Sequence, residues 1–123
     1  MNSCIRKFLL SNGLVLVVHD ATRRYYEDYH LVRLEIAGTI RLCEEFFDDA
    51  ESFAAARRLL GETVVYRRVL ERMGVPYNQI GSVREVLIRN FENHALPYMS
   101  DEGFPGKLAR AELAAALKKG GLK

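Results

Sequence analysis

The feature that most constrains the fold is an Asn-Gly pair near the start of the chain, with apolar residues on both sides of it. Asn12 and Gly13 separate residues 5–10 from residues 14–18, and both segments are rich in aliphatic or aromatic side chains. Asn-Gly readily adopts the two positive φ angles of a type I′ turn, which joins antiparallel strands. The sequence therefore predicts an N-terminal β-hairpin closed by a two-residue turn.

The predicted hairpin carries apolar side chains on both of its faces. A two-residue turn places Leu9 opposite Leu16 on one face. It places Phe8 opposite Val17 on the other face. A single small core covers only one of these faces, so the other needs a second layer or a partner chain, and we predict self-association through the hairpin. The candidate residues are its apolar side chains, with Leu14, Leu16 and Val18 as one candidate face and Phe8, Val15 and Val17 as the other.

Two further segments extend the predicted sheet. Residues 20–24 indicate a turn, and residues 29–36 then alternate apolar and polar side chains as a half-buried strand does. Gly38 suggests a bulge or bend before the extended pattern resumes at residues 39–42. Residues 62–73 fit both strand and helical spacing, and we favour a strand because Val64, Val65 and Tyr66 open the segment.

The remaining segments have helical spacing. Apolar residues recur every three or four positions over residues 44–61, 82–91 and 107–119. We therefore expect one α+β domain over residues 1–123, in which an N-terminal antiparallel β-meander of three to four strands packs with about three helices.

Charge and cysteine content narrow the class of protein. Lys and Arg number 18 against 16 Asp and Glu, and this net charge of +2 is too small to require nucleic acid or an anionic membrane as partner. The longest aliphatic run, residues 14–18, falls far short of the ~20 residues of a membrane helix. Cys4 and Cys43 form no Cys-x-x-Cys motif, so we predict reduced thiols in a cytoplasmic protein, with no structural metal and no cofactor.

An Arg/Tyr cluster is the main candidate for ligand binding. Its residues are Arg23, Arg24, Tyr25 and Tyr26, which we place in a loop between two strands. Arg binds phosphate through paired hydrogen bonds and Tyr stacks on bases, so the cluster suggests a nucleotide or single-stranded nucleic acid. The structural alternative is that one Tyr packs on the sheet edge while the arginines pair with Glu27 and Asp28.

A metal-assisted hydrolase is a third alternative. Carboxylates recur at i and i+4 in residues 44–49, a spacing that suits Mg²⁺, and His19 is a further donor; the acids are Glu44, Glu45, Asp48 and Asp49. The same acids are also explained as charges that complement the positive end of a helix dipole. No Gly-x-Ser-x-Gly or phosphate-loop motif occurs, so we predict no catalytic residues and disfavour an enzyme.

Short strings spread along the chain carry two resemblances. They are NGLVL (12–16), DATR (20–23), LVRL (31–34), LGETVVY (60–66), ALPY (95–98) and GFP (103–105). Together they resemble a small uncharacterised bacterial protein family, a domain of unknown function, and this resemblance implies no catalytic residues. The string DATRRY (20–25) is similar to the Asp-x-Ser-x-x-Gly signature of PilZ domains, which bind cyclic dinucleotides on a small barrel. Here Thr22 replaces the Ser, Tyr25 replaces the Gly, and no Arg-x-x-x-Arg precedes the string.

The sequence thus favours a non-enzymatic interaction module of the cytoplasm. Its expected partner is a second copy, giving a homodimer or larger homo-oligomer, or another protein. Nucleotide or single-stranded nucleic-acid binding is the less favoured alternative, and no membrane partner is expected.

Overall fold

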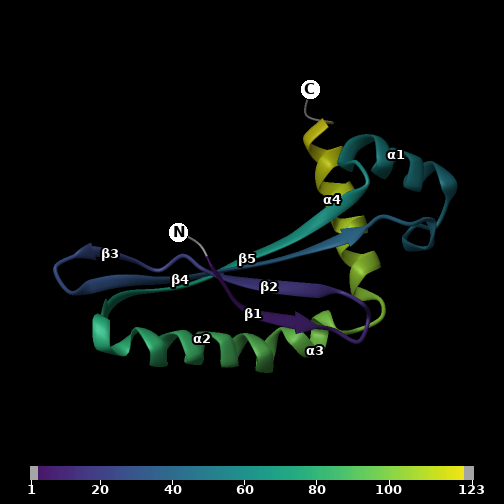
Figure 1. Ribbon diagram of the computed structural model, residues 1–123. Coiled ribbons are helices and arrows are strands. Elements are labelled where there is room, and N and C mark those ends of the chain that lie inside the picture. The colour runs from purple at the N-terminus through teal and green to yellow at the C-terminus, as the bar shows by residue number, and fades with distance from the viewer. Residues whose placement is uncertain (1–2, 121–123) are drawn as a thin grey trace.

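The computed structural model describes residues 3–120 and combines one antiparallel sheet with helices (Figure 1). The α+β class predicted from the sequence is confirmed. The strands are β1 (Ser3–Leu9), β2 (Val15–Asp20), β3 (Arg23–Tyr26), β4 (Tyr29–Arg41) and β5 (Thr63–Pro76). The helices are α1 (Ala50–Leu60), α2 (Ile80–His94), α3 (Leu96–Met99) and α4 (Phe104–Gly120), with 3-10 turns η1 (Glu44–Phe46) and η2 (Tyr77–Gln79).

Strand β4 is the centre of the sheet. One of its edges pairs with β5 along almost its whole length, from Tyr29 opposite Pro76 to Arg41 opposite Thr63. The other edge is shared by β2 and then by β3, and β1 lies outside β2. Within the described residues β1, β5 and the short strand β3 each pair with one strand alone, so each has a free edge. The pairing of β1 with β2 is irregular between Cys4 and Arg6.

The hairpin between β1 and β2 forms, but its predicted turn and register are wrong. Phe8 lies opposite Leu16, and Leu9 lies opposite Val15. The loop is one residue longer than predicted, because the backbone N–H of Leu10 donates to the carbonyl of Leu14 at 2.9 Å. A shift of one residue moves each side chain to the opposite face of a strand.

The longer loop is explained by the side chain of Asn12. Its amide nitrogen donates to the carbonyl oxygens of Met99 at 2.7 Å and Asp101 at 2.8 Å, and its amide oxygen accepts from the N–H of Leu14. Gly13 has a φ of 90°, whereas Asn12 has no positive φ, so the turn is not type I′. Contacts with residues far along the chain thus select the loop geometry.

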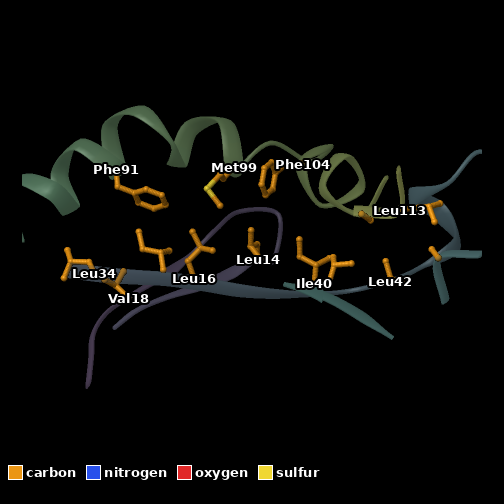
Figure 2. Close-up of a cluster of buried hydrophobic side chains, with 14 of the residues drawn as sticks. Leu14, Leu16, Val18, Leu34, Ile40, Leu42, Phe91, Met99, Phe104 and Leu113 are labelled. Atoms are coloured by element: carbon orange, nitrogen blue, oxygen red, sulfur yellow. The ribbon is translucent and has the colours of Figure 1, made fainter. Parts of the chain in front are cut away.

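The hydrophobic core lies between one face of the sheet and the helices. Burial alternates along β4. Val32, Leu34, Ile36 and Ile40 are buried, whereas Glu35, Ala37 and Thr39, which point to the other face, are not. Figure 2 shows sheet side chains pointing toward α2, α3 and α4, with Leu14, Leu16, Val18, Leu34 and Ile40 below and Phe91, Met99, Phe104 and Leu113 above.

The bulge expected at Gly38 is absent, since β4 pairs with β5 through this position without a register shift, and the glycine permits close packing inside the sheet. A Cβ atom at this position would lie 2.7 Å from Cδ2 of Leu16 and 2.8 Å from the carbonyl oxygen of Val15. Real Cβ atoms do not approach other atoms this closely. Glycine is therefore required where β2 enters the sheet beside β4.

Three helix boundaries differ from the sequence prediction. The segment from Glu44 forms only a 3-10 turn, and α1 begins at Ala50, because the carboxylate of Asp49 accepts the N–H of Ser52 at 2.7 Å as an N-cap. Helices α2 and α4 begin at Ile80 and Phe104, a few residues earlier than predicted, and α3 was not predicted. Residues 62–73 lie in or next to β5, as favoured.

Candidate functional site: the uncovered side of the sheet

The face of the sheet opposite the core carries no helix among residues 3–120 (Figure 1). We call this the open face and define it by the side chains that alternate with the buried ones. Its apolar members are Leu9, Val15, Val17, Ala37, Val65, Val69 and Met73. None of these side chains is buried, and the exposed fractions of Leu9 and Met73 reach 77% and 66%.

A charged network crosses the middle of the open face. The Nε of Arg33 donates to Glu35 at 2.9 Å and its Nη1 donates to Glu71 at 2.5 Å. These two hydrogen bonds raise the pKa of Arg33 above its ordinary value, so its guanidinium keeps its charge at any physiological pH. A hollow of about 360 Å³ lies beside the network, between His19 and Arg67. The open face therefore combines apolar side chains with paired charges.

Strand β5 also leaves one edge free. Within the described chain its only strand partner is β4, and its residues 67–74 are exposed except Leu70, which is half-buried. Long unpaired edges are usually shortened or interrupted, because their free N–H and C=O groups pair readily with another strand. Here Gly74, with a φ of 72°, and Pro76 interrupt only the end of the strand. Residues 63–72 form an uninterrupted edge.

The structure separates the predicted self-association residues into two groups. Leu14, Leu16 and Val18 are buried beneath the helices, so they are core residues and the prediction that they form a contact face is wrong. Phe8 shares their face and packs on Phe91, with ring centroids 6.2 Å apart. Val15 and Val17 do lie on the open face. The physical reason is the register shift, which also turns Leu9 outward.

The part of the open face that β5 contributes was not predicted from the sequence. Val65, Val69 and Met73 follow one another at intervals of four residues, and an even interval signals one face of a strand. The same residues also fit helical spacing, and this ambiguity hid the signal.

The Arg/Tyr cluster is placed differently from expectation. Residues 23–26 form strand β3, and the chain reverses just after them, where Glu27 has a φ of 45°. Arg23 and Arg24 line a hollow of about 580 Å³. No described acid forms an ion pair with either arginine. Asp28 accepts the N–H of Tyr77 at 3.4 Å instead. Tyr25 and Tyr26 are exposed and do not line the hollow.

Two residues that the sequence did not indicate complete this hollow. Arg84 pairs with Asp20 at 2.6 Å, while its own Nε is buried without a hydrogen-bond partner. Tyr77 is 72% exposed and lies 6.0 Å from the ring of His30. Both come from the region around the N-terminus of α2, more than fifty residues after Arg23, so no local pattern could connect them.

The acids proposed for a metal site do not converge. Among the residues that the structure describes, no three His, Cys, Asp or Glu side chains form a group that could hold a metal ion. Glu44 and Glu45 lie in η1, His19 lies in β2, and Asp49 caps α1. The hydrogen bonds from Ser52 lower the pKa of Asp49, so this carboxylate acts at the helix terminus.

In comparisons with known proteins, no protein-family model, curated protein or solved structure matches the chain. None of the helices within residues 3–120 combines the length and the apolar character needed to cross a membrane.

Proposed function

We propose that the protein is a non-enzymatic interaction module that self-associates through the uncovered side of its sheet, meaning the open face together with the free edge of β5. The observation that carries this proposal is the one-sided covering of the sheet, in which the helices pack on one face alone. Exposed apolar side chains that gather on one face are typical of protein contacts.

The energetic case rests on the most exposed apolar residues of this surface. Val15, Val69, Met73 and Leu9 are 38%, 43%, 66% and 77% exposed. Complete burial of such a side chain stabilises by about 1.5–3 kcal/mol, so each partly exposed one has roughly 1 kcal/mol left to gain in a contact. In a symmetric contact each of these residues is buried in both copies, so the gain in free energy doubles. This gain offsets much of the free energy lost when two molecules associate.

We place this module in the cytoplasm. Cys4 is exposed and Cys43 is half-buried, and both are free thiols. Exposed free thiols persist in reducing compartments, whereas oxidising ones favour disulfides.

Light scattering coupled to size-exclusion chromatography tests the proposal. At micromolar concentration the protein should elute as a dimer or larger species of its 14.0 kDa chain. The variant Val69→Lys should reduce the mass toward that of the monomer. Val86→Lys is the matched control, because Val86 is 41% exposed on α2 and Val69 is 43% exposed on the open face. A monomer at every concentration, or equal effects of both variants, would refute self-association through this surface.

A second candidate function is the binding of a phosphorylated ligand in the hollow beside β3. The supporting observation is that Arg23 and Arg24 line it without an acidic partner among the described residues, next to Arg84 and the start of α2. Guanidinium groups bind phosphate oxygens in pairs, and the exposed ring of Tyr77 offers a stacking surface for a base.

Titration with ATP, inorganic phosphate and a short single-stranded oligonucleotide tests this second candidate. A phosphate-driven complex must weaken steeply as salt concentration rises. Arg24→Ala should weaken binding, while Arg89→Ala, on α2 and away from the hollow, should not. The absence of binding, or binding that ignores salt, would remove this function.

A further inference from the structure

We infer that two copies pair edge to edge through their β5 strands, antiparallel and centred on Val69, so that one sheet runs through both copies. This inference rests on the proposed self-association and specifies its partner and register. It uses the β5 side of the surface, including Val69 and Met73, whereas Leu9 and Val15 lie on β1 and β2 and stay outside the contact. It draws on two observations, the direction of the free backbone groups of β5 and the order of charges along it.

The free backbone groups of β5 belong to its odd-numbered residues. The N–H and C=O of Arg33 point away from β5, since they bond to Thr22 and Ala21. In antiparallel strands the direction alternates from residue to residue, so even-numbered residues of β4 face β5. Their partners in β5, such as Leu70 opposite Leu34 and Arg68 opposite Ile36, are also even-numbered. The backbone N–H and C=O groups of Val65, Arg67, Val69 and Glu71 therefore point outward at the free edge of β5.

A two-fold axis at Val69 brings complementary side chains together on the open face. Val69 meets its own copy, and Arg67 of each copy lies opposite Glu71 of the other. Val65 lies opposite Met73, which is 66% exposed. Opposite charges and apolar pairs that face each other directly across two strands stabilise their pairing. The backbone groups of Arg67, Val69 and Glu71 also point to the free edge, so these residues can form the hydrogen bonds between the two strands.

Neighbouring registers put like charges opposite each other. Centring on Arg67, Arg68 or Glu71 places each of these residues against its own copy, and centring on Leu70 places Arg68 against Arg72. Like charges directly opposite destabilise strand pairing. The register at Val69 avoids all four conflicts and also overlaps most of the uninterrupted edge.

The core side of the same register is also compatible with pairing. Arg72 of each copy lies opposite Tyr66 of the other. Tyr66 lines a hollow of about 630 Å³ together with Leu108, Glu112 and Arg67, and in this register the guanidinium group of Arg67 is paired with Glu71 of the other copy. A guanidinium group that enters this hollow meets an aromatic ring and a carboxylate, both of which attract a cation.

Charge reversal at the two central pairs tests the register. Arg67→Glu sets a second carboxylate opposite Glu71 of the other copy, and Glu71→Arg sets a second guanidinium opposite Arg67. Each variant alone should therefore dimerise at least ~10-fold more weakly. A mixture of the two variants has opposite charges at both pairs and should recover a mixed dimer.

Circular dichroism controls for folding in this experiment, since Glu71→Arg also removes a partner of Arg33. Single variants that dimerise as the unmodified chain does would overturn the register. A mixture of folded variants that stays monomeric would overturn it as well.

A designed disulfide tests the position of the two-fold axis directly. In a hydrogen-bonded antiparallel pair the Cα atoms lie about 5.5 Å apart, a separation that a disulfide spans. Val69→Cys, with Cys4 and Cys43 changed to Ser, should therefore form a covalent dimer under mild oxidation. Thr39→Cys in the same background is the control, because Thr39 is exposed on the open face but lies one strand away from the edge.

The cross-linking result separates the two proposals. If the protein dimerises but the Thr39→Cys variant cross-links and the Val69→Cys variant does not, the edge pairing fails and self-association stands. If the protein is monomeric at every concentration, both the self-association and the β5 pairing are refuted.

Discussion

The hairpin register determines which face of the sheet is open, and a pair of alanine variants tests it. Leu16 is fully buried and Leu9 is 77% exposed, although a two-residue turn would have placed them on the same face. Leu16→Ala leaves a cavity that closes poorly, because Leu16 packs directly against the backbone at Gly38. Buried Leu→Ala changes cost about 2–5 kcal/mol, and this site belongs in the middle of that range, at about 3–4 kcal/mol. Leu9→Ala should change the free energy of unfolding of a monomer by less than ~0.5 kcal/mol.

Urea unfolding measures both effects. The two substitutions should be made in the Val69→Lys background, so that dissociation of a dimer does not contribute to the transition. With urea m-values of about 1–3 kcal/mol/M, Leu16→Ala should lower the midpoint by roughly 1–3 M and Leu9→Ala should leave it almost unchanged. Similar losses for the two variants would mean that both side chains face the core. The register, the open face and the proposed contact surface would then all be wrong.

Three further predictions concern the fold. Gly38→Ala should destabilise by about 2 kcal/mol or more, since its Cβ would meet Leu16 and a carbonyl oxygen, whereas Gly81→Ala in α2 has open space around it and should stabilise by up to ~1 kcal/mol in thermal unfolding. Asn12→Ala should cost about 1–3 kcal/mol in urea, because it leaves loop carbonyls unpaired; no loss would contradict the anchoring of the turn. The lowered pKa of Asp49 implies stability that is present above its ordinary value of 3.8 and is lost as pH falls through the lower folded value. The difference in urea midpoint between the unmodified chain and Asp49→Asn should therefore shrink in acid, and a constant difference would contradict this.

The sequence predicted those elements whose signals are local. The alternation of Leu34 and Ile36 with Arg33 and Glu35 indicated both the strand and its buried face, because side chains of a strand alternate strictly. The Asn-Gly pair indicated a hairpin, because its turn preference is a property of the two residues themselves. The register was not predictable, since the side chain of Asn12 bonds to Met99 and Asp101, almost ninety residues away.

Long-range contacts also explain the other differences. The expected helix at Glu44 is interrupted where Arg110 of α4 donates to the carbonyl of Phe46 at 2.6 Å. The hollow beside β3 requires Tyr77 and Arg84, which no spacing connects to Arg23. For the candidate surface, the sequence revealed the apolar character of the hairpin but not that β5 extends the open face. That required the pairing of β5 alongside β4.

The irregular pairing of β1 with β2 affects how far an assembly could grow. A contact that uses β5 from both copies leaves each copy with the edge of β1 and the four-residue edge of β3. The β1 edge is distorted between Cys4 and Arg6, and Arg6 is held by Glu85 of α2 at 3.2 Å. A bulged and charged border offers a poor template to an incoming strand. If the proposed β5 pairing forms, we therefore expect growth to stop at a closed pair and not to continue into a fibre.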